Sequence, residues 1–235
     1  MSPLRVSFQG VAGAFGEDAI ARHWGNEAIA VPARTFRETV ELAVNGTADL
    51  AVLPSWNTSI GTIDAAMHVL EAHSRELAVE GEVILPVRHH LLALPGTAME
   101  DVRYVGSHPA ALAQCQRFLE ANPQMTKLSA FDTAGAAMEL AALGKVPTTV
   151  GAAAGGTPDD EREAWHGAVP AAGPRSLAVI ASERASATYG LVPLVRDVQD
   201  DAGNHTCFVI LRPAIPRTRT DIARQLRSAT REVCA

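Results

Sequence analysis

Several side chains in this 235-residue chain could take part in chemistry if their spacing allowed it. His89, His90 and His108 are groups that could bind a metal ion or transfer protons. They lack the paired spacing of metal ligands, and adjacent or isolated histidines are more often structural. Gly10 and Gly13 suggest a phosphate loop, but no third glycine and no Gly-Lys-Ser/Thr sequence accompanies them. Neither pattern predicts a metal ion or a bound nucleotide.

The composition argues against several other classes of function. The net charge is −6 with dispersed basic residues, whereas nucleic-acid binding usually needs a basic face. No apolar run of about 18 residues could span a membrane, and the N-terminus lacks the regions of a signal peptide. The three cysteines, Cys115, Cys207 and Cys234, have neither disulfide-framework nor zinc-site spacing. We therefore expect a soluble, cytoplasmic protein without a zinc site.

Strands and helices are predicted to alternate along the chain. Phe36, Val40 and Ala43, for example, recur at helical spacing before Gly46, which is typical of an amphipathic helix and its end. This alternation favours an α/β fold with mixed, largely parallel sheets. The predicted strands are 4–10, 48–54, 82–94 (interrupted at Pro86), 102–107, 176–182 and 204–212, and the predicted helices are 17–24, 36–45, 63–70, 109–119, 133–143 and 183–189.

Two segments break this alternation. Residues 146–174 are rich in alanine, glycine and proline, which predicts an inserted loop. Such a loop could act as a lid or an oligomer contact, or it could be a neutral surface insertion. The tail over 213–235 fits one helix and no further domain.

Five segments, in this order, carry a resemblance to a known family. The sequence from Gly10 to Glu17 is similar to the Gly-Pro-x-Gly-Thr/Ala-aromatic-Ser-Glu opening loop of the prephenate dehydratase domain. The other four are Ala51 to Gly61, which resembles Val-Leu-Pro-Ile-Glu-Asn-Ser-Ser-x-Gly; Leu85 to His89; Ser107 to Cys115; and Ala178 to Leu191 followed by Asn204 to Phe208, which resembles Asn-x-Thr-Arg-Phe. The resemblance covers about residues 4–211.

This resemblance implies a two-lobed, periplasmic-binding-protein-like fold with the substrate site in a cleft between the lobes. Lobe 1 is expected over 1–83 with 191–212, and lobe 2 over 84–190. The implied reaction is the loss of water and carbon dioxide from prephenate to give phenylpyruvate, without a cofactor. The family also implies a homodimer or homotetramer. Because only about two dozen residues follow Arg212, we expect no phenylalanine-sensing regulatory domain in this chain.

The resemblance also assigns roles to residues. Thr206 matches the catalytic threonine, which would donate to the leaving hydroxyl in a dry, organised site. Gln114 would orient substrate or water. The expected substrate contacts are Asn57, Thr58, Ser59, Ser107, Gln114, Gly13, Ala14 and Phe208. Simpler interpretations exist, since Thr206 could be an ordinary strand residue, Ser107 a helix cap and Asn57 a turn former.

Three positions depart from the family pattern. Trp56 stands where the family has a glutamate, Cys207 where it has the arginine of Thr-Arg-Phe, and Gly16 where it usually has serine. If the glutamate and arginine pair with each other, their joint loss would be structurally neutral. If the arginine binds substrate instead, a thiol cannot replace its bidentate contact. Trp56 and Cys207 are therefore candidates for altered specificity.

Three hypotheses follow. The first is a dehydratase acting on prephenate or a close relative, which Thr206, Asn57, Ser107 and Gln114 favour. The second is a lyase of specialised metabolism, such as a prephenate decarboxylase that does not aromatise its product, which the lost charges favour. The third is a non-catalytic protein that binds a small carboxylate. A different chemistry at Cys207 is also conceivable, but a buried thiol is usually inert.

Overall fold

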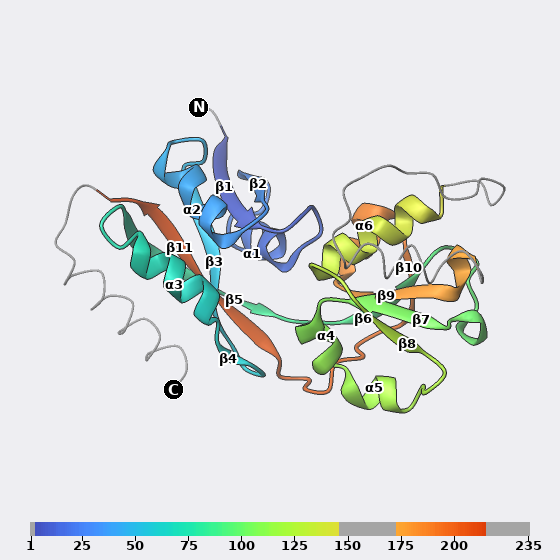
Figure 1. Cartoon of the computed structure of the whole chain (residues 1–235). Helices are drawn as coiled ribbons and strands as arrows, with labels where there is room; N and C mark the ends of the chain where they lie inside the picture. The colour runs from blue at the N-terminus through green and yellow to red at the C-terminus, as the bar shows by residue number, and fades with distance from the viewer. Residues whose placement is uncertain (1–2, 146–172, 215–235) are drawn as a thin grey trace. The chain divides into compact units, whose positions relative to one another are not determined.

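The computed structural model describes residues 3–145 and 173–214, which divide into two compact units (Figure 1). The first unit contains residues 3–11, Phe15–Val87 and the described residues from 203 onward. The second contains Ala12–Ala14 and the described part of Arg88–Ala202. The chain thus leaves the first unit after Val87 and returns to it at Gly203, as one extra strand.

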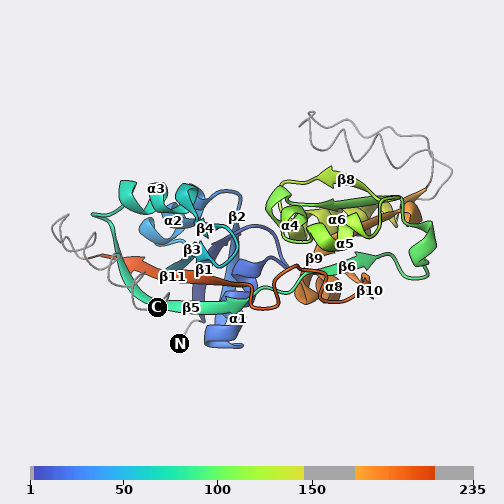
Figure 2. The same ribbon diagram turned by 90° about the horizontal axis from the view of Figure 1, so that it is seen from below.

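The first unit is a mixed sheet with the strand order β2-β1-β3-β11-β5, and the short β4 pairs with β3. β1 runs parallel to β2 and β3, whereas β11 runs antiparallel to both β3 and β5. Helices α2 and α3 lie on one side of the sheet and α1 on the other (Figure 2). Its elements are β1 (Leu4–Gln9), α1 (Phe15–Trp24), β2 (Ala28–Ala33), α2 (Phe36–Val44), β3 (Leu50–Asn57), β4 (Gly61–Thr62), α3 (Asp64–Ala72), β5 (Leu77–Pro86) and β11 (His205–Pro213).

The core beneath α2 and α3 identifies which way the β11 side chains point. Val209 and Leu211 of β11 pack in one buried cluster with Val40 of α2 and Leu70 of α3. Successive side chains of a strand point to opposite faces. The odd-numbered residues of β11 therefore face α2 and α3, and the even-numbered residues face the side of α1.

The second unit is also a mixed sheet, with the strand order β10-β6-β9-β7-β8. β7 is parallel to β8 and β9, and β6 is antiparallel to β9 and β10. One face packs against α4 and α5, and Figure 1 shows α6 on the other face. Its elements are β6 (His90–Ala93), the 3-10 turn Met99–Asp101, β7 (Tyr104–Ser107), α4 (Pro109–Ala113), α5 (Gln116–Glu120), β8 (Thr126–Ser129), α6 (Thr133–Leu143), the 3-10 turn Pro174–Ser176, β9 (Leu177–Ala181), α8 (Glu183–Tyr189) and β10 (Val192–Val195).

The mixed α/β class predicted from the sequence is confirmed, with two corrections. Parallel pairing does not dominate, because each sheet joins a parallel part to an antiparallel part. Residues 191–202 belong to the second unit rather than the first, because β10 pairs with β6, and residues 84–87 belong to the first unit. The predicted insertion over 146–174 and helix over 213–235 lie outside the described residues, apart from 173–174 and 213–214.

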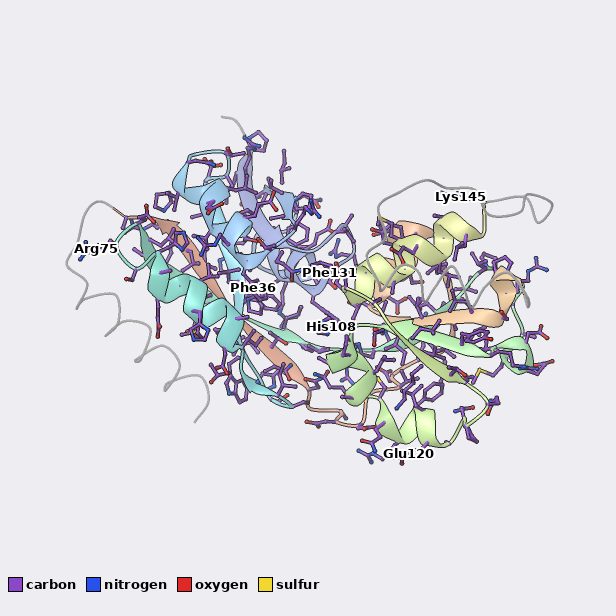
Figure 3. The ribbon with its side chains drawn as sticks, in the orientation of Figure 1. Phe36, Arg75, His108, Glu120, Phe131 and Lys145 are labelled. Carbon is purple, nitrogen blue, oxygen red and sulfur yellow. The ribbon has the colours of Figure 1, made fainter. Side chains whose placement is uncertain are left out.

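The single helix predicted over 109–119 is wrong, because the chain forms two short helices there. His108, at the start of α4 in Figure 3, caps that helix by accepting from the backbone N–H of Ala110. Asp200 then begins α5, because its carboxylate accepts from the backbone N–H groups of Gln116 and Arg117, each at 3.0 Å. None of the helices within the described ranges is long and apolar enough to cross a membrane.

Candidate active site

Asn57 and Thr206 lie directly opposite each other, where β3 ends and β11 begins. Nδ2 of Asn57 donates to Oγ1 of Thr206 at 2.9 Å and to the carbonyl oxygen of His205 at 3.0 Å. Oδ1 of Asn57 accepts from the backbone N–H of Ser59 at 2.8 Å. Both Asn57 and Thr206 are buried. The hydrogen bonds fix the Asn57 amide at its oxygen and at its nitrogen, with its N–H groups directed at β11.

Asn204 completes this arrangement, although the sequence pattern had assigned it no role of its own. Its Oδ1 accepts from Nδ2 of Asn57 at 2.9 Å and from Oγ1 of Thr58 at 3.1 Å. The Thr58 hydroxyl oxygen also accepts from the backbone N–H of His205 at 3.0 Å. The signal for Asn204 was its place two residues before Thr206 in the Asn-x-Thr sequence. We call Asn57, Thr58, Asn204 and Thr206 the asparagine–threonine network.

The network leaves the Thr206 hydroxyl able to donate. A hydroxyl has one proton and two acceptor positions. Asn57 uses an acceptor position of Oγ1, and no further hydrogen bond of this hydroxyl is formed within residues 3–145 and 173–214. The proton of a buried Thr206 can therefore be directed to an oxygen atom of a bound molecule.

A β-bulge at Ser55 is what brings Asn57 to the same face as Thr206. Cys207 pairs with Trp56 while Phe208 pairs with Pro54, so Ser55 is an extra residue in β3. Bulges of this kind re-aim the side chains that follow them. Ser55 is buried, and its hydroxyl donates to the carbonyl oxygen of Cys207 at 3.1 Å, which holds the bulge in place.

Trp56 and Cys207, the two departures from the family pattern, are cross-strand partners of each other. They belong to the opposite face of the sheet from Asn57 and Thr206, because neighbouring residues in a strand alternate. The buried Cys207 thiol lies 3.6 Å from Oε2 of Glu82, and the Trp56 ring lies 5.7 Å from the His205 ring. Trp56 and Cys207 thus do not contribute to the face that carries the Thr206 hydroxyl.

Two other predicted contacts of the first unit have different surroundings. Phe208 is buried on the same face of β11 as Thr206 and packs as a core residue. Ser59 is exposed, and its backbone N–H, rather than its hydroxyl, supports Asn57. Gly16 is a close-packing position, since a Cβ atom there would lie 3.0 Å from the Phe8 ring.

Ser107 and Gln114 lie in the second unit. Ser107 is fully buried at the end of β7, and its hydroxyl donates to the carbonyl oxygen of Ile180 at 2.6 Å. Ser107 is not the cap of α4, because His108 has that role. Gln114 ends α4, and its Oε1 lies 3.1 Å from Nε2 of the buried His89. Burial lowers the pKa of His89 to about 4, so this imidazole is neutral at physiological pH.

Gly13 and Ala14 also belong to the second unit. The Gly13 carbonyl accepts from the hydroxyl of Ser182, the residue that caps α8, at 2.9 Å. Gly13 has a φ of +88°, and a Cβ atom there would lie 2.9 Å from Cα of Ala185. This glycine is therefore required by the close packing of its loop against α8. The predicted cleft between the lobes stays a prediction.

His90 shows how differently the second histidine of the pair is used. Its Nδ1 accepts from the backbone N–H of Asp197 at 3.0 Å, and its Nε2 lies 3.5 Å from Oε2 of Glu183. Arg196 also pairs with Glu183. His90 therefore has a structural role beside the ion pair of Arg196 and Glu183. Among the residues that the structure describes, no group of three or more histidine, cysteine or acidic side chains could hold a metal ion.

Comparison with known proteins agrees with this architecture. The prephenate dehydratase structure of Arthrobacter aurescens, in complex with L-Phe, superposes with a TM-score of 0.70 at 23% identity and covers 92% of this chain and 63% of that one. A structure described as GqqA, a novel type of quorum quenching acylases, gives a TM-score of 0.68 at 27% identity and covers 91% of this chain and 65% of that one. The chain therefore shares the two-unit α/β fold of these structures.

Sequence comparison gives the family. The prephenate dehydratase family model matches residues 6–215, and the chain belongs to this family. Arogenate dehydratase/prephenate dehydratase 1, chloroplastic, of Arabidopsis thaliana is 37% identical over 219 residues, covering 92% of this chain and 47% of that protein. Arogenate dehydratase 1 of Petunia hybrida is 36% identical over 219 residues, covering 92% of this chain and 44% of that protein. The chain spans about half the length of the curated relatives it matches.

Proposed function

We propose that this chain is a prephenate dehydratase-type lyase, which converts prephenate or a close relative to an arylpyruvate such as phenylpyruvate. The observation that carries the proposal is the asparagine–threonine network. Asn57 occupies an acceptor position of the Thr206 hydroxyl and leaves its proton for a substrate oxygen. A dehydration needs a donor of this kind at the leaving hydroxyl.

The reaction breaks two bonds of the substrate. The bond between the ring and its carboxylate breaks, and its electron pair enters the ring as carbon dioxide leaves. The ring double bonds shift, and the bond to the ring hydroxyl breaks with its electron pair. Thr206 donates its proton to that departing oxygen, so that water leaves, and a solvent proton restores the hydroxyl. Because a threonine is a poor acid, the donation depends on its fixed position in a buried site.

The placement of Trp56 and Cys207 supports dehydration over the diverted lyase. If their side chains shared the face of Thr206, the lost glutamate and arginine would indicate a changed substrate contact. They lie on the other face as a cross-strand pair. The chemistry at Thr206 therefore does not depend on the two charges that this chain lacks.

The names of the relatives widen the substrate class. Several are called arogenate dehydratases. Arogenate carries an amino group where prephenate carries a keto group, and both have the ring carboxylate and ring hydroxyl. The step at Thr206 is the same for both substrates, so both belong in the assay.

The decisive experiment compares Thr206→Val with Thr206→Ser. Valine keeps the shape and strand preference of threonine without the hydroxyl, and Asn57 retains two other acceptors. We expect Thr206→Val to lose on the order of 100-fold or more in kcat, and Thr206→Ser to retain most of the activity. Products are separated by chromatography and mass spectrometry at neutral pH, with an enzyme-free control because prephenate aromatises slowly by itself.

Each product identifies one hypothesis. Phenylpyruvate from prephenate, or phenylalanine from arogenate, that forms with the wild type and not with Thr206→Val supports the dehydratase. A decarboxylated product that keeps its hydroxyl identifies a non-aromatising decarboxylase. No turnover of either substrate, with phenylpyruvate still bound in calorimetry, identifies a binding protein. The cytoplasmic location and the homodimer or homotetramer remain part of the proposal, and sedimentation of the purified chain tests the assembly.

A further inference from the structure

β3 is an interior strand of the first sheet, yet it contains a proline. β1 lies on one side of β3 and β11 on the other. Proline has no backbone N–H group, and within sheets it is confined to edge strands, the first residue of a strand and bulges. Pro54 is opposite Phe208, at the register shift that marks the bulge. β3 therefore tolerates this proline at the bulge, where the strand lacks one backbone donor.

Ser55, the extra residue of the bulge, supplies a hydroxyl donor at the same place. Ser55 is buried, and its Oγ donates to the carbonyl oxygen of Cys207 at 3.1 Å. Its own carbonyl accepts from the backbone N–H of Ile63, which precedes α3, at 3.0 Å. Ser55 thus ties β3 to β11 by its hydroxyl and to the start of α3 by its backbone. The Val-Leu-Pro-Ile-Glu-Asn pattern of the family has an isoleucine here, which has no polar side-chain atom, so the hydroxyl distinguishes this chain.

The hydrogen bond between Ser55 and Cys207 lies directly beside the asparagine–threonine network. Cys207 follows Thr206 in β11, and Ser55 lies two residues before Asn57 in β3. On the other flank, the two remaining members of the network hold the chain segments together through their own hydrogen bond. The contact between Asn57 and Thr206, at 2.9 Å, is therefore bracketed by two side-chain hydrogen bonds. Hydrogen bonds weaken steeply outside a narrow range of distance and angle, so the loss of one flank weakens the contact between them.

We propose that Ser55 is a positioning residue of the dehydratase site, whose hydroxyl keeps β3 in the register at which Asn57 holds the Thr206 hydroxyl in its donating orientation. Without this hydroxyl, the bulge loses a side-chain contact with β11. Nδ2 of Asn57 then no longer fixes Oγ1 of Thr206, and the proton of Thr206 is not directed at the leaving oxygen. This inference rests on the proposed function, because Thr206 delivers a proton only in that reaction. Ser55 acts through Asn57 and does not donate to the substrate itself.

The test exchanges Ser55 for residues with and without a hydroxyl. Ser55→Ala removes the donor, whereas Ser55→Thr keeps it and has a high preference for strands. We expect Ser55→Ala to lower kcat about tenfold with KM within about twofold of the wild type, because Thr206 donates its proton in the transition state. Ser55→Thr should keep kcat within about threefold of the wild type. Ser55→Cys, whose thiol is a weak donor, should fall between them and remains a test if Ser55→Ala does not fold.

Ser7→Ala is the matched control for the loss of a buried hydroxyl. Ser7 lies in β1 of the same sheet, is fully buried, and donates to the carbonyl oxygens of Thr39 and Leu50 at 2.7 and 3.2 Å. Ser7→Ala should lower the urea midpoint of unfolding, as Ser55→Ala does, but should keep kcat within about twofold of the wild type. Equal kcat losses in these two variants, or in Ser55→Ala and Ser55→Thr, would overturn the proposal.

A double-mutant cycle tests whether Ser55 acts through Thr206. In the Thr206→Val background the hydroxyl that Ser55 helps to orient is absent, so adding Ser55→Ala should lower kcat no further. A further loss that multiplies with that of Thr206→Val would show that Ser55 affects turnover by another route, and the positioning role would be wrong.

A measurement without turnover distinguishes failure of this inference from failure of the proposed function. The side-chain amide resonances of Asn57 in ¹H–¹⁵N spectra, assigned by their loss in Asn57→Asp, report its hydrogen bond to Thr206. We expect them to shift in Ser55→Ala and to stay unchanged in Ser7→Ala. Unchanged Asn57 resonances in Ser55→Ala would contradict the inference even in an active enzyme. A wild type without dehydratase activity, in which Ser55→Ala still shifts these resonances, would refute the dehydratase and leave the positioning of Asn57 by Ser55 established.

Discussion

Restoring the two family charges at positions 56 and 207 tests whether these residues form a structural pair on the sheet face opposite Thr206. The variants are Trp56→Glu, Cys207→Arg and the two combined. Trp56 and Cys207 are opposite each other across β3 and β11, and the buried Cys207 thiol is 3.6 Å from Oε2 of Glu82. Neither side chain shares the sheet face of Thr206.

The structure predicts how each single substitution changes the free energy of unfolding and how the two substitutions combine. Trp56→Glu removes a half-buried indole and adds a second carboxylate to the face that carries Glu82, which should cost about 2 kcal/mol. Cys207→Arg overpacks a buried position at a cost of about 1–3 kcal/mol, partly offset by attraction to Glu82. In the double variant the guanidinium lies between two carboxylates. We expect the two substitutions to couple favourably by at least about 1 kcal/mol.

Urea unfolding of all four proteins measures this coupling, and turnover of prephenate measures the effect on the site. The folded double variant should keep kcat/KM within about threefold of the wild type, because positioning at Thr206 is unchanged. Additivity within about 0.3 kcal/mol would refute the cross-strand pairing of the two positions. Unchanged stability with a large loss of turnover would refute their assignment to the face opposite Thr206.

Three further outcomes follow from the geometry. Burial lowers the pKa of His89 from 6.5 to about 4, so below pH 6.5 the unfolded chain binds a proton that the folded chain excludes. The free energy of unfolding measured in urea should therefore fall by about 3 kcal/mol between pH 6.5 and about 4. A similar fall in His89→Met would contradict this cause. Burial, and secondarily Asp200, raises the pKa of Cys115 to about 12, so iodoacetamide at pH 8 should modify it only after unfolding; peptide mass spectrometry that finds modified Cys115 in folded protein would be contrary evidence. In thermal unfolding, Gly13→Ala should lower the free energy of unfolding by about 3 kcal/mol and Gly190→Ala by about 1 kcal/mol. Both glycines have a positive φ, but only a Cβ atom at Gly13 would lie against Ala185. Equal losses in the two variants would count against this packing.

Elements with a strong apolar pattern were predictable from the sequence. The run before Arg212 became β11, and the Ser182 and Gly190 signals became the two ends of α8. The edge strands β2 and β8 were missed because their patterns are weak: β2 contains Pro32 among alanines, and the described side chains of β8 are mostly exposed. Proline and polar residues are tolerated at sheet edges, where pairing rather than composition defines the strand.

The break between α4 and α5 shows a different limit of sequence reasoning. No glycine or proline interrupts residues 110–120, so local preference predicts one continuous helix. The second helix begins where it does because Asp200 caps it from 83 and 84 residues further along the chain. The backbone N–H of Asp200 also donates to the carbonyl oxygen of Gln114, so the break between the two helices fixes the backbone of this expected substrate contact.

The family pattern suggested candidate site residues, but it could not tell on which face of the sheet each side chain lies. Residues 56 and 57 are neighbours in β3, and residues 206 and 207 are neighbours in β11. A shift of the strand register by one residue would move each side chain to the opposite face of the sheet. The bulge at Ser55 decides the outcome, since it lies between Leu53, which packs on the α2 side, and Asn57, which faces the other side. Nothing in the local sequence distinguishes Ser55 as the extra residue; its hydrogen bond to Cys207, 152 residues away, does.

This division of faces explains how the chain combines an intact asparagine–threonine network with two lost charges. A buried ion pair can be replaced by apolar residues without loss of stability if both charges are removed together, whereas removing one leaves the other uncompensated. Positions 56 and 207 meet this condition because they are cross-strand partners. Asn57 and Thr206, one residue away in each strand, keep their own contact on the other face. The residues at positions 56 and 207 therefore change the opposite face of the sheet and leave the hydrogen bond between Asn57 and Thr206 in place.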